Sequence, residues 1–213
     1  MIIEITNATK KIKGSLILDN VSLTFRSGKI YGLQGPNGSG KTMLMRLIAG
    51  LIRPTSGIVC VEGRILGKEM DFPDSLGILI ENPAFLPGYT GQKNLELLAD
   101  IQGKISSIDI CEALSSVGLD PYDKRTVRKY SLGMKQRLGI AAAVMEKPDI
   151  IILDEPFNAL DDSGIAEISN LIFRERDRGA LIIISCHDGN MLESMSDEIY
   201  TIFDGKVQLK CEQ

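Results

Sequence analysis

Residues 35–42 constrain this chain more than any other stretch. They fit the pattern G-x-x-x-x-G-K-[ST] and read Gly35, Pro36, Asn37, Gly38, Ser39, Gly40, Lys41 and Thr42. An apolar run typical of a strand precedes them, and an amphipathic run typical of a helix follows. Glycines allow backbone N–H groups to turn toward phosphate oxygens, and the start of the helix adds the positive end of its dipole. The stretch is therefore predicted to be a phosphate-binding loop between a strand and a helix.

The residues at the end of this stretch have expected roles of their own. Lys41 places a positive charge near the outer phosphates of a triphosphate, and the hydroxyl of Thr42 is a ligand for Mg²⁺. Met43 is also expected to contact the nucleotide. The alternative is a glycine turn with a surface lysine, but such a turn does not require the flanking strand and helix.

Length and charge limit the classes of function. The chain has 213 residues, of which 44% are hydrophobic, so it can bury a large core and is short enough for one domain with lobes. Its formal net charge is −4. Proteins that bind nucleic acid usually carry a basic surface, so we expect no direct nucleic-acid partner.

The cysteines and the apolar runs indicate a cytoplasmic protein. Cys60, Cys111, Cys186 and Cys211 form no C-x-x-C pair, which argues against a disulfide framework and a zinc site. Residues 1–6 resemble an edge strand rather than a signal peptide. No apolar run approaches the roughly 18 residues that span a bilayer. Membrane association is therefore expected only through a partner.

The hydrophobic patterns predict an α/β fold over residues 1–213. Alternating residues near the N-terminus and at 57–63 predict a small antiparallel sheet. Helical spacing dominates residues 84–146, which we expect to form an inserted helical subdomain. Residues 150–153 and 181–184 are continuous apolar runs typical of parallel strands buried on both faces, and the helical pattern between them predicts a βαβ crossover.

Two adjacent carboxylates, Asp154 and Glu155, follow the first of these buried strands. Ligands bind beyond such strand ends in open α/β sheets. Asp154 is placed to hold Mg²⁺ through its water shell, and Glu155 can orient an attacking water. A solvated turn is the alternative, which the phosphate-binding loop upstream disfavours.

Together with residues 130–137, these motifs resemble the ATP-binding cassette family, the ATPases of ABC transporters. The family's D-loop is matched by Asn158, Ala159, Leu160 and Asp161, and its switch histidine by His187. The resemblance covers nearly the whole chain. The sequences of residues 80–83 and 130–137 are similar to those of exporters of the bacitracin and lantibiotic-resistance type. It implies a P-loop NTPase core with a mixed or parallel sheet, an N-terminal antiparallel β-subdomain and a helical subdomain.

The resemblance also implies a site shared between two chains. Signature residues Ser131, Leu132, Gly133 and Met134 would face the ATP of a second subunit, so that a head-to-tail homodimer encloses two ATP molecules. His187 would sense the γ-phosphate. An ordinary serine N-cap is the alternative for Ser131, and a merely exposed or structural role is the alternative for a lone histidine.

Three departures from the family pattern affect the expected site. Leu132 and Met134 stand where the signature usually has Gly and Gln. Glu81 replaces the Q-loop glutamine, and we hypothesise that its carboxylate tightens Mg²⁺ binding and alters coupling. Ile12 stands where an aromatic residue stacks on adenine, so only apolar contact remains and discrimination between ATP and GTP is expected to be weak.

Two surface segments have open interpretations. The basic cluster, Lys124, Arg125, Arg128 and Lys129, could contact anionic lipid headgroups or an acidic partner loop, or form a solvated face. Residues 85–89 suit either a groove that receives a cytoplasmic helix of a permease or packing between lobes.

The resemblance implies an ATP-hydrolysing subunit that uses ATP and Mg²⁺ to power export, such as that of an antimicrobial peptide or drug, through a separate membrane permease. It would be cytoplasmic and peripheral on the inner face of the cell membrane. One rival is a soluble cassette ATPase that acts on ribosomes or DNA, but its usual tandem cassettes, coiled coil or basic surface are not found. A GTPase would need an N-K-x-D motif, and a kinase would not explain residues 131–137.

Overall fold

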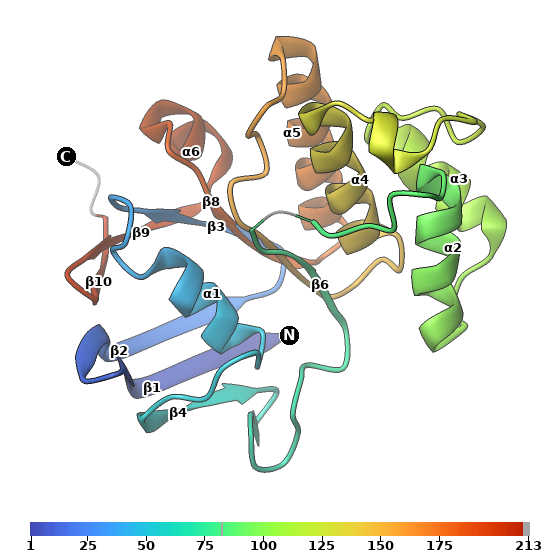
Figure 1. The fold of residues 1–213 in the computed structure, drawn as a ribbon. Helices are drawn as coiled ribbons and strands as arrows, with labels where there is room; N and C mark the ends of the chain where they lie inside the picture. Colours follow the sequence, from blue (N-terminus) through green and yellow to red (C-terminus); the bar gives the residue numbers. More distant parts are fainter. Residues whose placement is uncertain (82, 211–213) are drawn as a thin grey trace.

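Two β-sheets form the framework of the protein, whose computed structural model describes residues 1–81 and 83–210 (Figure 1). The four-stranded sheet has the order β2-β1-β4-β5, and the six-stranded sheet has the order β10-β9-β3-β8-β7-β6. The strands of the first sheet are β1 (Ile2–Ile12), β2 (Ser15–Arg26), β4 (Ser56–Val61) and β5 (Arg64–Ile65). Those of the second are β3 (Lys29–Gln34), β6 (Leu76–Leu79), β7 (Ile150–Leu153), β8 (Leu181–Ser185), β9 (Glu198–Phe203) and β10 (Lys206–Leu209).

The four-stranded sheet is antiparallel, which confirms the prediction for the N-terminal part of the chain. The prediction that residues 1–6 form an edge strand is wrong, because β1 lies between β2 and β4 and pairs with both. Alternation in β1 sends Ile3 and Ile5 into the core and leaves Glu4 exposed. That alternation reports which face is buried, and it carries no information on how many neighbours the strand has.

The six-stranded sheet is mixed, as expected. Strands β6, β7, β8, β3 and β9 run parallel to one another, and β10 pairs antiparallel with β9. Helix α5 (Asp162–Asp177) connects β7 to the adjacent parallel strand β8, so the βαβ crossover is confirmed. Every residue of β7 and β8 is buried.

The other helices are α1 (Lys41–Ile48), α2 (Gly91–Gln102), α3 (Ser107–Ser116), the 3₁₀-helix η1 (Val127–Lys129), α4 (Leu132–Val144) and α6 (Gly189–Met195). In Figure 1, α1 lies between the two sheets, whereas α2, α3 and α4 gather beyond β6. Local capping explains where several of them begin and end. Thr90 caps α2, and Ser106 forms a capping box with Asp109 at the start of α3. Gly118, with φ +73°, follows the end of α3.

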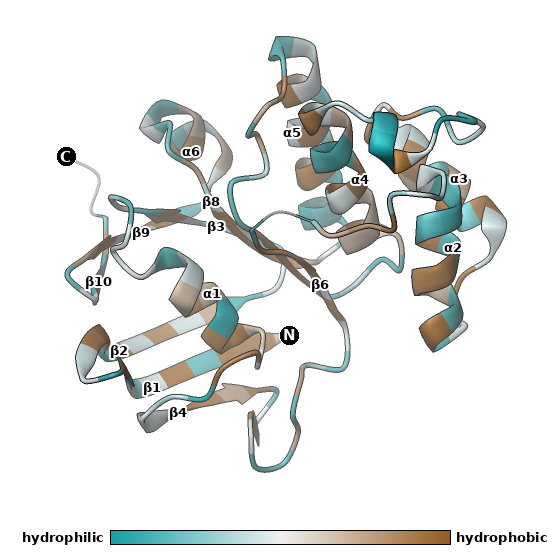
Figure 2. Ribbon diagram, viewed as in Figure 1, coloured by the Kyte–Doolittle hydropathy of each residue, from teal (hydrophilic) through white to brown (hydrophobic). Residues whose placement is uncertain are grey.

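Two apolar clusters cover opposite faces of the six-stranded sheet, whose strands are mainly hydrophobic in Figure 2. Ile151 and Ile182 belong to the cluster that packs against α4 and α5. Their neighbours Ile152 and Ile183 belong to the cluster that contains α1 and the four-stranded sheet. Successive side chains thus enter different cores, which is why these strands are continuous apolar runs. None of the helices in the described ranges has both the length and the hydropathy needed for a membrane crossing.

Substitution of Gly77 tests the close packing of β6 on α4. A Cβ at Gly77 would lie 1.8 Å from the carbonyl oxygen of Ala143, so backbone must move to accommodate it. We expect Gly77→Ala to lower the unfolding free energy by about 3 kcal/mol, at the upper end of overpacking costs. Chemical denaturation would measure the change. Gly88→Ala is the control, because no heavy atom lies within 4 Å of its added Cβ; equal stability of the two variants would contradict the prediction.

Candidate phosphate and metal site

The predicted phosphate-binding loop connects β3 to α1, and its backbone requires glycine. Gly38 and Gly40 have φ values of +79° and +112°, a region that residues with a Cβ rarely adopt. At Gly35, a Cβ would lie 2.3 Å from the carbonyl oxygen of Ile202. The strand, loop and helix follow one another as expected, with α1 beginning at Lys41. Pro36 and Asn37 are exposed on the loop, and Met43 is half-buried in the first turn of α1.

Lys41 is a buried cation whose hydrogen-bond partners among the described residues are backbone carbonyls. Its side chain donates from Nζ to the oxygens of Gly35 and Pro36, at 2.7 and 3.2 Å. The residue is only 7% exposed, and it forms no ion pair within the described ranges. The buried Oγ of Ser39, in the same loop, has no hydrogen-bond partner within the described residues. A buried positive charge without a counter-charge favours a bound anion, so the loop fits a phosphate group.

A carboxylate lies directly beside this loop. Thr42 donates from Oγ1 to Asp154 Oδ2 at 2.6 Å, and Asp154 follows β7 with only 9% of its surface exposed. Mg²⁺ prefers oxygen ligands and is commonly held by one or two protein carboxylates together with substrate phosphates. The described residues contain no cluster of three or more His, Cys, Asp or Glu side chains that could hold a metal. The two side-chain oxygens of Thr42 and Asp154 that meet here fit a Mg²⁺ ion that takes its remaining oxygens from phosphate and water.

Glu155 follows Asp154 directly, and its φ is +52°. Its Oε2 accepts a hydrogen bond from the backbone N–H of His187 at 3.1 Å. The imidazole Nε2 of His187 lies 3.3 Å from Oε1, but the geometry is not that of a hydrogen bond and Oε1 has no donor in the described chain. Burial raises the pKa of the Glu155 carboxyl, an effect that His187 and Lys41 partly offset. Glu155 can thus accept a hydrogen bond from a water molecule, as a general base requires.

The carboxylates border a hollow of about 320 Å³. It is lined by Glu81, Leu132, Gln136, Asp154, Glu155, Asn158 and Ala159. Glu81 is therefore near the candidate metal ligands, but its Oε1 lies 2.7 Å from the guanidinium of Arg46, which balances its charge. The predicted metal role of Glu81 stays a prediction.

Residues 131–134 begin helix α4 beside the predicted D-loop. Ser131 is the N-cap of α4, and its Oγ accepts the N–H of Met134 at 3.1 Å. The ordinary N-cap role, which was the alternative for Ser131, is therefore present in this single chain. Leu132 is 65% exposed. A Cβ at Gly133 would lie 2.5 Å from the carbonyl oxygen of Ala159, which explains the glycine. The exposed start of α4 is consistent with contact to a second molecule.

The rest of the predicted D-loop leads into α5. Asp161 is the N-cap of that helix, and Asn158 and Leu160 form backbone turns with Glu155 and Phe157. The guanidinium of Arg137 on α4 pairs with Glu167 and lies 3.7 Å from Asp161. Ile12 ends β1 in a hairpin with β2 and is 36% exposed. Its expected contact with the base stays a prediction.

Comparison with known proteins identifies the family. Residues 18–158 match the family model described as ABC transporter. This chain belongs to the ABC transporter family. A Bacillus subtilis relative, the uncharacterized ABC transporter ATP-binding protein YybJ, is 47% identical over 97% of this cassette and 94% of the relative. The lantibiotic transport ATP-binding protein SrtF of Streptococcus pyogenes is 38% identical over 99% of the cassette and 90% of its own length.

Two further comparisons extend this result. The bacitracin transport ATP-binding protein BcrA of Enterococcus faecalis is 39% identical over 96% of the cassette and 67% of its own length. A dimeric structure of a post-hydrolysis state of the ATP-binding cassette MJ0796 bound to ADP and Pi has a TM-score of 0.86 and 26% identity, and covers 98% of this cassette and 97% of that chain. The resemblance stated from the sequence is confirmed, and the protein is an ATPase cassette. These relatives do not favour the ribosome or DNA rival.

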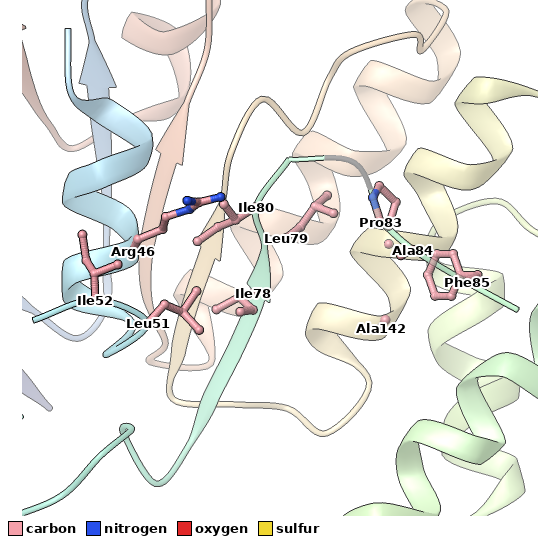
Figure 3. Close-up of a pocket in the computed structure, with 11 residues that line it drawn as sticks. Arg46, Leu51, Ile52, Ile78, Leu79, Ile80, Pro83, Ala84, Phe85 and Ala142 are labelled. Carbon is pink, nitrogen blue, oxygen red and sulfur yellow. The ribbon is translucent and has the colours of Figure 1, made fainter. Parts of the chain in front are cut away.

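An apolar groove of about 370 Å³ is lined in part by Arg46, whose ion-pair partner Glu81 lines the hollow at the carboxylates (Figure 3). Arg46, Leu51 and Ile52 border it on the α1 side, whereas Pro83 and Phe85 border it on the α4 side. Of residues 85–89, Phe85 also packs against the core that contains α4, while Leu86 and Tyr89 are 51% and 49% exposed. Both interpretations of this segment thus have a structural basis. Asn82, one of residues 80–83, and Cys211 lie outside the described residues.

The basic cluster is a largely exposed surface of the cassette. Arg125 pairs with Asp123 at 2.7 Å, and Lys124, Arg128 and Lys129 are exposed. The ion pair reduces the charge available to a membrane or an acidic loop, which agrees with the solvated-face interpretation.

Sequence reasoning missed three residues that organise the site: Arg46, Gln136 and Ser185. Gln136 is buried and donates from Nε2 to the carbonyl oxygen of Glu155 at 2.9 Å. Ser185 is fully buried and contacts both Asp154 and Glu155. A hydroxyl at the end of an otherwise apolar strand was the available signal for Ser185, and Arg46 had none.

Pyrophosphate offers a direct test of the loop without hydrolysis. At ten times its Kd, it should stabilise the folded cassette by about 1.4 kcal/mol, which corresponds to a rise of about 3–6 °C in Tm. Lys41→Met should abolish most of the rise because the buried cation is lost. Thermal denaturation with and without pyrophosphate measures it. Lys104→Met, in the exposed connection between α2 and α3, should retain the full rise; an equal response of both variants would refute the assignment.

Proposed function

We propose that two copies of this cassette close on two MgATP molecules, hydrolyse them and thereby drive export through a separate membrane permease. The observation that carries this proposal is the buried Lys41, which forms no ion pair within the described residues, next to Thr42 and Asp154. A cation of this kind favours a phosphate, and the adjacent oxygens favour the metal that accompanies a triphosphate. Glu155 directly follows Asp154 in the sequence and supplies a base for the attacking water.

The residues of the chain divide the chemistry among them. Residues 35–43 hold the phosphates, with Lys41 opposite the outer ones, and Ile12 contacts the base. Thr42, Asp154 and Glu81 hold Mg²⁺, which offsets negative charge on the phosphates when bound. Glu155 orients the attacking water and accepts its proton. His187, whose backbone already binds Glu155, contacts the γ-phosphate through its exposed imidazole.

A second copy completes each site. Ser131, Leu132, Gly133 and Met134 of one copy contact the ATP held by the other, with the helix N-terminus favouring negative charge. Asn158, Ala159, Leu160 and Asp161 contact the opposite copy next to these residues. The exposed start of α4 supports this arrangement, as does the dimeric form of the similar MJ0796 cassette. Each chain has one phosphate-binding loop and one such segment, so a head-to-tail pair encloses two nucleotides.

The groove in Figure 3 is the proposed docking site for a short cytoplasmic helix of the permease. It is apolar, and its two sides come from α1 and from residues 83–85, which belong to the proposed helical subdomain at 84–146 or its border. The cassette would then be cytoplasmic and peripheral on the inner face of the membrane. The names of SrtF and BcrA support a peptide antibiotic or similar drug as the exported substrate.

Hydrolysis by two variants tests the assignment. Glu155→Gln should bind MgATP with an affinity close to that of the unaltered protein but lower kcat by at least about 100-fold, because only the base is removed. Lys41→Ala should weaken nucleotide binding itself, because the phosphates lose their buried cation. Phosphate release and binding of a fluorescent ATP analogue separate these effects. Unchanged hydrolysis in either variant would refute the corresponding role.

The Arg46–Glu81 ion pair offers a test of the metal role of Glu81. Glu81→Gln should raise the Mg²⁺ concentration needed for half-maximal binding of the ATP analogue by about two- to fivefold, since exposed charge pairs contribute up to about 1 kcal/mol. Arg46→Met should lower it, because Glu81 then lacks its cation. The double variant should follow Glu81→Gln. Identical Mg²⁺ dependence of all the proteins would show that Glu81 takes no part in metal binding.

A further inference from the structure

Ser185 joins the two acidic residues of the site through one hydroxyl. It is the last residue of β8 and is 0% exposed. Its Oγ donates to Asp154 Oδ1 at 2.6 Å and accepts the backbone N–H of Glu155 at 2.9 Å. These two contacts use the donor and one acceptor position of the serine side chain.

The position of Ser185 follows from the order of the strands. It pairs with Leu33 at the end of β3, two residues before the phosphate-binding loop, and Ile184 pairs with Leu153 at the end of β7. Ser185 therefore lies between the strand that leads to the loop and the strand that leads to Asp154. An aliphatic side chain here would leave Asp154 Oδ1 and the N–H of Glu155 without this partner in a buried site.

The bond to Asp154 fixes the orientation of a proposed metal ligand. Ser185 binds Oδ1 and Thr42 binds Oδ2, so both oxygens of the carboxylate have a hydroxyl partner. Thr42 is itself a proposed metal ligand, whereas Ser185 is enclosed behind the carboxylate. Partners of this kind, behind a ligand, hold it in position for the metal.

The bond to Glu155 fixes the backbone of the proposed base. The φ of Glu155 is +52°, a conformation that non-glycine residues adopt only when their surroundings enforce it. Ser185 binds its N–H and Gln136 binds its carbonyl oxygen, so both sides of the residue are held. The direction of the carboxylate depends on this backbone.

We propose that Ser185 is a positioning residue that orients Asp154 for the metal and Glu155 for the attacking water through the same hydroxyl. The inference rests on the proposed function of these two acidic residues. It requires metal binding and turnover to decline together when the hydroxyl is removed, while the phosphate-binding loop is unaffected.

Ser185→Ala in the full chain tests this coupling. Binding of a fluorescent ATP analogue in EDTA should stay within about twofold of the unaltered protein. The Mg²⁺ concentration for half-maximal metal-dependent binding should rise by about tenfold or more, the usual effect of removing a partner behind a metal ligand. At saturating Mg²⁺, kcat should fall about tenfold or more while KM for ATP changes less than about threefold. Ser185→Cys, which keeps the volume and a weak donor, should lie between the two proteins and serves if the alanine variant does not fold.

Ser196→Ala is the matched control. The Ser196 Oγ is enclosed and has no hydrogen-bond partner within the described residues, so the same atom is removed without loss of a contact to the site. This control should match the unaltered protein in Mg²⁺ dependence and kcat. If Ser185→Ala also matches it in both, or only lowers Tm, the serine is merely structural and the inference is wrong. If the unaltered protein shows no Mg²⁺-dependent binding of the analogue, the proposed function fails first and this inference falls with it.

Discussion

The hydrogen bond from Thr42 to Asp154 joins residues 112 positions apart and brings the phosphate-binding loop to the strand-end carboxylate. It depends on the sheet, because Thr42 follows β3 and Asp154 follows β7, with β8 between them. All three strands are parallel, so their carboxyl ends lie at one edge and the segments that follow them converge. Lys41 and the carboxylates of Asp154 and Glu155 thus lie together, although no local sequence motif contains all three.

Burial on both faces gives this edge its rigidity. Side chains of β7 and β8 alternate between the core around α1 and the core around α4 and α5, so a one-residue shift of register would exchange the side chains that fill the two cores and disrupt the packing of both. Ser185 ends β8 after a run of apolar residues, and its hydroxyl lies where the polar site begins. The strained Glu155 can persist because its N–H and carbonyl oxygen are bound by residues on two different packed elements.

Short sequence patterns predicted those parts of the site that are formed by neighbouring residues in the chain. Residues 35–42 specify a turn that only glycine permits, and the runs at 150–153 and 181–184 specify strands buried on both faces, so the loop and the βαβ unit were predictable. The interior position of β1 and the contacts of Ser185 were not, because both depend on which strands lie side by side. Arg46 and Glu81 meet across 35 residues for the same reason: α1 packs next to the end of β6, a fact that no periodicity encodes.

The site contains a buried hydrogen bond that is costly to break and an exposed ion pair that contributes little free energy. Ser185 and Asp154 are buried, so breaking their bond would leave polar atoms unpaired away from water, and the carboxylate stays in place. Arg46 and Glu81 are partly exposed, and an ion pair of this kind contributes only about 0–1 kcal/mol to stability. Either residue can therefore leave this partner and pair with another charged group. Arg46 lines the groove and Glu81 lines the hollow beside Asp154 and Glu155. The buried contacts thus hold the carboxylate of Asp154 in place, whereas the Arg46–Glu81 ion pair joins the residues that line the groove to those that line the hollow.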